Sequence, residues 1–341
     1  MKKGRIILAA AASLLLIALF FMWKGYSGLR LNTGDESKVL LIPTGSTYQD
    51  VIDSINTVTR IENQKVFDWI ADRKGYPQHV KAGRYMIDPG VNYSGLIDML
   101  RAGRQKPVNV TFNNIRTLAQ LAGRLGGRIE GDSSSLMAFF NDERNYASDG
   151  FNRATIISVF LPNTYQIFWN TDAKGFYSRM LKEYHNFWNQ DRIARAKAKG
   201  LTPLDVSILA SIVDDEVAKG DEKPRIAGVY LNRLKRGMLL QSCPTIKFAL
   251  NDFTITRVLR KHLVVESPYN TYKYKGLPPG PVGCPSIQGI EAVLNAENND
   301  YLYFAAKADF SGYHNFSRTL SEHNRYAAQY QAELNRRKIF D

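Results

Sequence analysis

The sequence predicts an α+β protein with an N-terminal transmembrane helix, a small α+β module and a mostly helical C-terminal domain with short strands. Three patterns support this prediction: an apolar run near the first residue, a strand–turn–helix unit that occurs twice before residue 103, and amphipathic helices after residue 200. The chain of 341 residues is long enough for two or three domains. Its apolar content of 44% and aromatic content of 11% are typical of globular proteins, so disorder is not expected.

An apolar run at the start of the chain predicts a membrane anchor. Ile6–Trp23 is interrupted only by Ser13 and is just long enough to cross a bilayer. Basic residues, which stay on the cytoplasmic side of a membrane, precede the run: Lys2, Lys3 and Arg5. We therefore expect a cytoplasmic N-terminus over residues 1–5, a transmembrane helix over 6–24 and the rest of the chain outside.

A cleavable signal peptide is the alternative interpretation of this run. Signal peptidase cuts after small residues, whereas the run ends in four bulky ones, Phe20, Phe21, Met22 and Trp23. No cysteine follows the run, which excludes a lipoprotein anchor. The prediction is a single-pass anchor in the inner (plasma) membrane, with the folded chain on the outer, periplasmic side.

The net charge of +13 would suit nucleic acid, anionic lipid or an anionic polymer. Lys and Arg are spread along the chain and no nucleic-acid motif is present, so no nucleic-acid partner is expected. A basic surface that is simply solvated is as good an explanation of the charge as binding to an anionic partner. The five histidines show no metal-ligand spacing, so we expect no metal site and no cofactor. The two cysteines, Cys243 and Cys284, permit a disulfide in an exported chain without requiring one.

An internal repeat defines the first folded module. Ile42–Asp53 aligns with Ile87–Asp98, and each copy has the pattern of a short strand, a glycine turn and a helix with an apolar face. Thr47 is expected to cap the first of these helices, with Asp50 in the capping-box position three residues later.

The module is predicted to span residues 38–103, behind a polar, glycine-containing tether over 25–37. Its pattern resembles the LysM-like module that binds glycan strands, and a simple spacer domain is the alternative. A weaker echo of the repeat follows, with a strand predicted over Val108–Phe112 and a helix over Thr117–Leu125. Residues 104–200 are otherwise expected to form an intervening, mostly helical region.

The helix predicted over Leu204–Val217 carries the main candidate for catalysis, Glu216. At about 100° per residue its apolar side chains form one stripe, and Glu216 falls near the middle of that stripe. Asp214 is expected to face solvent and Asp215 to lie at the edge. An apolar setting disfavours the charged carboxylate and raises its pKa, which suits a general acid. A structural ion pair is the alternative.

The C-terminal domain is predicted to span residues 201–341. A second amphipathic helix is expected over Arg225–Leu239, in which Gly228 would let another element approach closely. The other expected elements are a polar turn over Gln241–Ile246, a strand over Tyr301–Ala305, and helices over Ile287–Ala296 and Ser321–Lys338.

From Leu209 onward the motifs resemble, in order, those of the endolytic murein transglycosylases, the MltG or YceG-like family. Leu209–Glu216 resembles the catalytic helix of that family. The later segments that resemble it are Ile226–Leu234, Gly237–Gln241, Pro268–Tyr272, Gly276–Gly280, Tyr301–Phe304, His314–Ser317 and Ser321–Asn324. Leu161–Tyr165 resembles an upstream Pro-Asp-Thr-Tyr motif, so the resemblance touches nearly the whole chain.

Four positions depart from the family pattern. Val217 stands where the family usually has Thr, Cys243 where it has Asp, Asn163 where it has Asp, and Asp214 where it has a non-catalytic Glu. None of these departures removes Glu216, but they put in doubt any role of the carboxylate that is usual at position 243.

The resemblance implies a lytic transglycosylase that cuts the β-1,4 bond from N-acetylmuramic acid to N-acetylglucosamine in peptidoglycan without water. The 6-hydroxyl of the muramic sugar would attack its own anomeric carbon and leave a 1,6-anhydro end, which terminates a nascent strand. Because the substrate supplies the nucleophile, one carboxyl can act first as acid and then as base, and Glu216 is the candidate. The implied partners are glycan strands and the membrane, with a peptidoglycan synthase as a further candidate.

Six residues are expected to line the glycan groove: Gln241, Tyr269, Asn270, Tyr272, His314 and Asn315. Loop capping is the alternative for Asn270, and a direct catalytic role is a minor alternative for His314. Arg233 is a candidate partner for a carboxylate or, equally, a surface charge. The resemblance places Cys243 and Cys284 in one domain, where they are expected to meet as a disulfide or a close thiol pair, with two unrelated side chains as the alternative.

Two other functions remain open. A hydrolase of the same polymer, a muramidase, would need a second carboxylate near Glu216, and the best candidates are Glu266 and Asp215. A non-catalytic, membrane-tethered scaffold would use both domains only to bind glycan. The chemistry of the product ends separates the first alternative, and activity of the purified protein on glycan strands separates the second.

Overall fold

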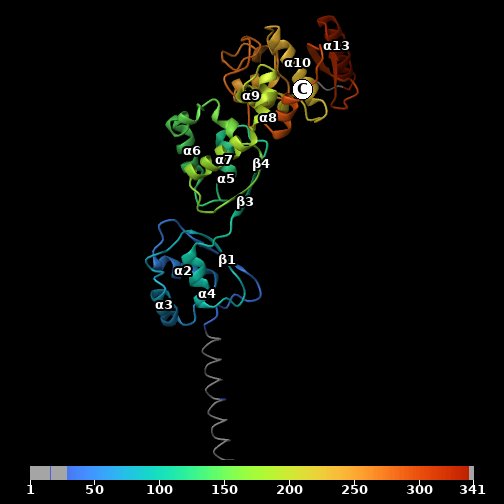
Figure 1. Cartoon of the computed structure of the whole chain (residues 1–341). Coiled ribbons are helices and arrows are strands. Elements are labelled where there is room, and N and C mark those ends of the chain that lie inside the picture. The colour runs from blue at the N-terminus through green and yellow to red at the C-terminus, as the bar shows by residue number, and fades with distance from the viewer. Residues whose placement is uncertain (1–15, 17–28, 338–341) are drawn as a thin grey trace, which may run out of the picture. The chain divides into compact units, whose positions relative to one another are not determined.

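The computed structural model describes Leu16 and residues 29–337. The predicted cytoplasmic residues 1–5 and, apart from Leu16, the predicted anchor over 6–24 lie outside the described part. Within the described residues, no helix is long and apolar enough to cross a membrane. Helices and short strands follow one another along the chain (Figure 1), so the predicted α+β class is confirmed.

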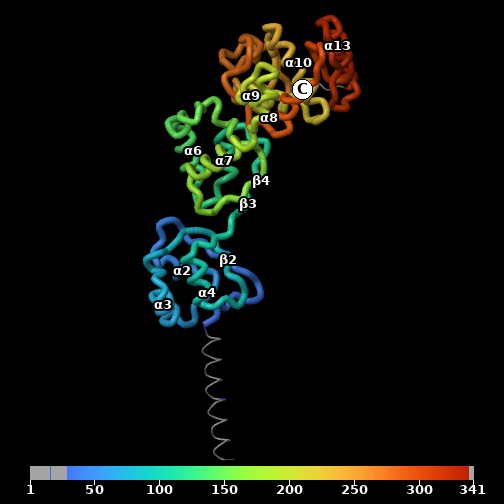
Figure 2. Tube along the Cα trace, viewed as in Figure 1, coloured from blue at the N-terminus to red at the C-terminus, as the bar shows by residue number. Residues whose placement is uncertain are grey.

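The chain divides into two compact units. The first combines the described residues up to Val110 with two later loops, Gly127–Gly131 and Gln166–Asp172. The second combines three segments, Thr111–Gly126, Asp132–Tyr165 and the described residues from Ala173 onward. Figure 2 traces the first unit mainly in blue and cyan and the second in green to red. A separate two-stranded sheet is formed by β3 (Val108–Phe112) and β4 (Asn163–Ile167).

The first unit is built from the two copies of the repeat. Strand β1 (Lys38–Ile42) pairs antiparallel with β2 (Gly83–Ile87). A glycine with positive φ follows each strand, Gly45 at 85° and Gly90 at 72°, where a residue with a side chain would be strained. The helices of this unit are α2 (Tyr48–Val58), α3 (Gln64–Arg73) and α4 (Tyr93–Ala102).

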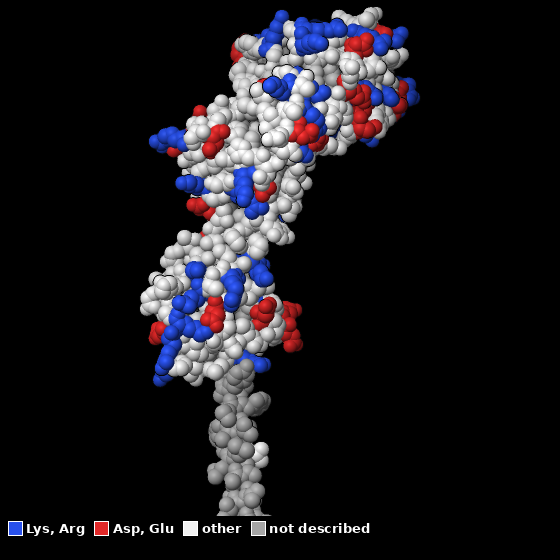
Figure 3. All heavy atoms as spheres, viewed as in Figure 1, with Lys and Arg blue, Asp and Glu red and all other residues white. Residues whose placement is uncertain are grey.

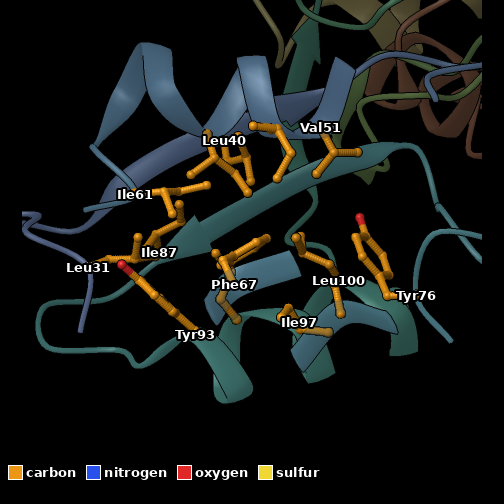
Figure 4. Packing of buried hydrophobic residues seen from close by; sticks show 14 of the residues in the cluster. Leu31, Leu40, Val51, Ile61, Phe67, Tyr76, Ile87, Tyr93, Ile97 and Leu100 are labelled. Atoms are coloured by element: carbon orange, nitrogen blue, oxygen red, sulfur yellow. The ribbon is translucent and has the colours of Figure 1, made fainter. Parts of the chain in front are cut away.

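Capping and burial hold the first unit together. The predicted capping box of α2 is confirmed, since Asp50 N donates to the Thr47 hydroxyl at 3.3 Å and Thr47 N donates to the Asp50 carboxylate at 2.7 Å. Inward-facing strand residues and the apolar faces of the helices meet in one core (Figure 4). Tyr93 is fully buried there, and its hydroxyl accepts a hydrogen bond from Asn63 N at 3.1 Å, so its polar end is satisfied.

The second unit is mostly helical. Its helices are α5 (Leu118–Leu125), α6 (Ser133–Asn141), α7 (Ala173–Phe187), α8 (Gln190–Ala198), α9 (Pro203–Glu216), α10 (Lys223–Lys235), α11 (Cys243–Ala249), α12 (Ile287–Leu294) and α13 (Leu320–Arg336). An antiparallel pair of strands precedes α13, β5 (Tyr303–Ala306) and β6 (His314–Ser317). Short 3-10 turns lie at Glu143–Asn145, Ala147–Asp149, Ile156–Val159 and Arg260–His262.

Helix α9 is the buried centre of the second unit. Every residue from Val206 to Val213 is buried, including Ser207 and Ser211, because α10, α11 and α12 all pack against this helix. The predicted division into one apolar stripe and one solvent face is therefore wrong for the middle of the helix. A helix that is covered on all sides carries its polar residues into the interior, where they must find partners.

The predicted close approach at Gly228 is confirmed. A Cβ atom at Gly228 of α10 would lie 2.7 Å from the Glu297 carbonyl oxygen and 2.7 Å from Asn299 Nδ2. Only glycine lets the segment after α12 lie directly on α10.

In the view of Figure 3, Lys and Arg side chains gather on one part of the first unit, with Asp and Glu side chains beside them, and charged side chains of both signs also lie on the second unit.

Candidate active site

Glu216 is the last residue of α9 and is partly buried. Its Oε1 atom accepts two hydrogen bonds, one from Tyr230 Oη at 2.8 Å and one from Ser242 Oγ at 2.8 Å. Tyr230 comes from α10 and Ser242 directly precedes α11, and both residues are buried. Three elements thus converge on one carboxyl oxygen, while Oε2 has no hydrogen-bond partner among the residues that the structure describes.

Burial raises the pKa of Glu216 above the usual carboxyl value of 4.5. The hydroxyls of Tyr230 and Ser242 and the positive charge of protonated His314 lower the pKa of Glu216, but burial is the largest effect. Because both hydroxyls donate to Oε1, the neutral acid carries its proton on Oε2. The site therefore presents an acid whose one free oxygen can give a proton to a substrate and take one back.

His314, whose positive charge acts on Glu216, forms a second polar cluster with Glu222. The Glu222 carboxylate accepts hydrogen bonds from the backbone N–H of His314 at 3.0 Å and from its Nδ1 at 2.9 Å. The Glu222 side chain is only 5% exposed and the His314 side chain 14%. An ionised carboxylate only accepts, so this pattern assigns a proton to Nδ1 and leaves Nε2 free for another partner.

The loop that carries Ser242 is hydrogen-bonded to Thr271. Gln241 N donates to the Thr271 carbonyl oxygen at 3.0 Å, and Ser242 N donates to the Thr271 hydroxyl at 3.0 Å. Gln241 has a φ of 52°, in the left-handed region that residues with side chains adopt at a cost, and its side chain is exposed. The predicted groove residue Gln241 therefore lies at the surface next to the serine that holds Glu216.

Arg233 is buried and binds backbone oxygens. Its guanidinium donates to the carbonyls of Leu302 at 2.6 Å and Leu240 at 2.7 Å, with a longer bond to Leu239 at 3.4 Å. Both predicted alternatives, a carboxylate partner and a surface charge, are wrong. The residue instead fixes the chain two residues before Ser242 to the strand region that begins near Leu302.

Asn270 is the one predicted groove residue that is fully buried. Its Nδ2 donates to the carbonyls of Leu263 at 2.9 Å and Val265 at 2.8 Å, and its Oδ1 accepts from Tyr272 N at 3.0 Å. Both amide hydrogens are used by the loop, so the structure corresponds to the loop-capping alternative.

The other predicted groove residues are only partly exposed. The Tyr269 ring packs on Phe248 with a centroid distance of 4.6 Å, and Tyr272 Oη lies 3.4 Å from Cys243 Sγ. Asn315 lies in β6 opposite Ala305 of β5. Of the six predicted residues, His314 is the one whose charge acts on Glu216.

The prediction that Asp214 faces solvent is wrong. Its carboxylate accepts from Lys223 Nζ at 2.7 Å and from the N and Oγ atoms of Ser286 at 2.7 and 2.8 Å, and its side chain is 18% exposed. Asp214 therefore fastens the start of α12 to the end of α9. The projection of a single helix misses this because it does not include the neighbouring helix.

The two candidates for a second catalytic carboxylate are both engaged elsewhere. Asp215 makes a bidentate pair with Arg116 at 2.6 and 2.8 Å. Glu266 pairs with Lys273, and its side chain is 75% exposed. Neither carboxylate is hydrogen-bonded to Glu216 or to a residue that holds it, within the described part of the chain.

Both cysteines are free thiols, so the disulfide alternative is not formed in the structure. Cys243 opens α11 beside Tyr272, whereas Cys284 N is bonded to the Ile115 carbonyl at 2.7 Å. Burial raises the pKa of both thiols, which keeps them protonated. Over residues 29–337, no group of three or more His, Cys, Asp or Glu side chains could hold a metal ion.

Removing the donors to Oε1 is expected to shift the pH dependence of activity. Tyr230→Phe and Ser242→Ala each delete a hydrogen bond that lowers the pKa of Glu216, so that pKa rises further. A general acid works only while protonated, so the basic limb of the kcat/KM profile should move to higher pH in both variants. A limb that stays in place or moves to lower pH would contradict the assignment of Glu216 as the acid.

Fold and site together define an α+β protein in which one partly buried carboxylic acid, held by two hydroxyl donors at the end of a central helix, is available for acid–base chemistry. The family model of the YceG-like family matches residues 40–329, and the chain therefore belongs to the YceG-like family.

Two curated relatives carry the name endolytic murein transglycosylase. The protein from Bacillus subtilis is 28% identical over 310 residues, which are 86% of this chain and 85% of the relative. The protein from Streptococcus pneumoniae (strain D39) is 28% identical over 320 residues, which cover 85% of this chain but 57% of the longer relative. The crystal structure of a putative YceG-like protein from Listeria monocytogenes matches with a TM-score of 0.57 and 26% identity, over 86% of this chain and 99% of that one.

Proposed function

We propose that this protein is an endolytic lytic transglycosylase of peptidoglycan, which cuts the β-1,4 bond from N-acetylmuramic acid to N-acetylglucosamine within a strand. The names of its relatives support the activity and the polymer. The single observation that carries the chemistry is the Glu216 carboxyl group, with Oε1 occupied by Tyr230 and Ser242 and Oε2 left for the substrate.

The reaction needs one acid that acts twice. The Oε2 proton of Glu216 passes to the glycosidic oxygen as its bond to the muramic C1 atom breaks. The C6 hydroxyl oxygen of the same sugar then bonds to C1, and its proton passes to Glu216. The acid is restored, no water is consumed, and the products are a 1,6-anhydro end and a free 4-hydroxyl.

The surroundings of Glu216 favour this scheme over hydrolysis. A retaining or inverting glycosidase needs a second carboxylate about 5 to 9.5 Å away as nucleophile or base. Three of the acidic residues near Glu216 in the sequence have a basic side chain as their partner: Asp214 has Lys223, Asp215 has Arg116, and Glu222 has His314. The fourth, Asp221, accepts a long hydrogen bond from Tyr313 Oη at 3.5 Å. Carboxylates that are bound in this way are poorly placed to activate water.

Cleavage of purified, uncross-linked glycan strands tests the activity and its endolytic character. The full chain in detergent should convert long strands into fragments of intermediate length before disaccharides appear, because internal bonds are cut. Release of disaccharides from the start would show cutting from strand ends, and intact strands would leave the glycan-binding scaffold as the function.

The finer features of the layout also belong to this proposal. The apolar run over 6–24 supports a single-pass anchor in the inner membrane with the enzyme on the periplasmic side, and the module over 38–103 supports a LysM-like glycan contact. A membrane-bound cutter of nascent strands would work beside a peptidoglycan synthase. A reporter enzyme fused to the C-terminus should be active only outside the cytoplasm, and activity inside the cell would rule out this orientation.

A further inference from the structure

A pocket of about 460 Å³ lies on the outer face of the β1–β2 sheet, and every residue that lines it belongs to the first unit. Val39 and Leu41 of β1 point outward into it and are each 39% exposed. Arg84 of β2 is paired opposite Leu41. The remaining lining comes from the start of β3 and from the two later loops: Pro107, Val108, Asn109, Gly127, Arg128 and Trp169.

Specific hydrogen bonds fasten the two loops to the first unit. The Glu130 carboxylate accepts from Thr44 N at 2.5 Å and from Thr44 Oγ1 at 2.6 Å. Glu130 N donates to the Trp169 carbonyl at 2.7 Å, and Asn170 Nδ2 donates to the Ala82 carbonyl at 3.3 Å. The loops are thus anchored to the turn after β1 and to the residue before β2. These bonds place an indole ring and a guanidinium over an apolar sheet face.

The pocket carries positive charge that no carboxylate neutralises. Among the described residues, neither Arg84 nor Arg128 has an ion-pair partner, and no Asp or Glu lines the pocket. The carboxylate of Glu130, two residues after Arg128, accepts its hydrogen bonds from Thr44. Two guanidinium groups beside an apolar floor and an indole ring suit a ligand that has carboxylates as well as apolar faces.

We propose that this pocket binds the carboxylate-bearing peptide of a muramyl peptide, so that the first unit holds the substrate by its peptide rather than by its sugar rings alone. The inference rests on the proposed function, which makes peptidoglycan the substrate. A guanidinium binds a carboxylate through two parallel hydrogen bonds, and Val39, Leu41 and Trp169 can cover methyl groups and sugar faces. A site for N-acetylated sugars alone would have no use for two unpaired arginines.

Binding without cleavage tests the proposal. The full chain with Glu216→Gln is titrated with a disaccharide tetrapeptide from peptidoglycan and, separately, with a chitin tetrasaccharide, which has no carboxylate. The muramyl peptide should bind more tightly than the chitin oligomer, and its affinity should fall with added salt. Adding Arg84→Gln and Arg128→Gln should weaken muramyl peptide binding at least about tenfold and remove most of the salt dependence.

Matched controls lie on the same unit. Arg60→Gln removes an exposed arginine outside the pocket, and Trp69→Ala removes an indole that is 58% exposed and does not line it. Both controls should bind like the parent, whereas Trp169→Ala should weaken binding. The two arginine substitutions leave every loop hydrogen bond in place, so an unchanged melting temperature shows that a loss of affinity is not a loss of folding.

Three results would overturn the proposal: equal affinity for the chitin oligomer, unchanged binding in the double arginine variant, or binding of anionic phospholipid vesicles in place of the muramyl peptide. Because cleavage is not measured, each of these results leaves the transglycosylase activity untouched. Conversely, muramyl peptide binding by a protein whose wild-type form never cuts strands would support the pocket and contradict the proposed function.

Discussion

Replacing Glu216 by Gln is expected to abolish glycan cleavage while the protein stays folded. The amide oxygen can still accept from Tyr230 and Ser242, so the hydrogen bonds that hold the end of α9 remain. General acid–base catalysis is worth about 10²- to 10⁴-fold, and one group serves both steps here, so the loss should reach or exceed the upper end. Initial rates on purified strands give the measurement.

The neighbouring aspartates provide the matched controls. Asp215→Asn breaks a pair with Arg116 at the surface and should leave most of the cleavage rate. Asp214→Asn weakens the link to Lys223 and α12, so it should lower the melting temperature more than the rate of the folded protein. If Asp214→Asn or Asp215→Asn were as inactive as Glu216→Gln, the acid would have to be reassigned.

The raised pKa of Glu216 also makes a prediction about stability. A carboxyl group whose pKa is higher in the folded than in the unfolded chain contributes stability below its usual pKa, and this contribution is lost as the pH rises through the raised value. Glutamine does not ionise, so the Glu216→Gln variant does not lose this stability as the pH rises. The variant should therefore melt above the wild type at neutral pH, with a difference that shrinks toward pH 4, and the opposite trend would contradict a raised pKa.

Arg233→Met is expected to be the most damaging substitution for stability outside the apolar core. It leaves the buried carbonyls of Leu302 and Leu240 without their donor, which costs about 2–4 kcal/mol. For a domain of this size that corresponds to a melting temperature lower by roughly 10 °C. Arg236→Met, an exposed change on the same helix end, is the control. Equal melting temperatures for the two variants would show that the buried hydrogen bonds of Arg233 do not stabilise the fold.

Several helices, strands and caps could be predicted from the sequence because they depend on residues that are neighbours in the chain. The capping box at Thr47, strand β3 at Val108–Phe112 and the close approach at Gly228 all follow from neighbouring residues or from the absence of a side chain. The partial burial of Glu216 was also predictable, since its position near the middle of the apolar stripe turns its carboxyl group toward the interior.

The partners of Glu216 were not predictable in the same way. In the sequence, Tyr230 lies among the apolar residues of α10, and the signal of its polar role is that a buried tyrosine hydroxyl needs a hydrogen-bond partner. Ser242 follows Glu216 by 26 residues, and His314 follows Glu222 by 92, so only the fold brings them together. A single helix projection likewise could not show that α12 covers the side of α9 that bears Asp214.

The most direct test of the central claim is the mass of the new strand ends. Purified glycan strands are digested by the full chain in water enriched in ¹⁸O, and the fragments are analysed by mass spectrometry. One acid acting twice, with the sugar as its own nucleophile, predicts anhydro ends that are lighter than reducing ends by one water and carry no ¹⁸O. Reducing ends that contain ¹⁸O would show that water attacks the anomeric carbon and would contradict the transglycosylase mechanism of Glu216.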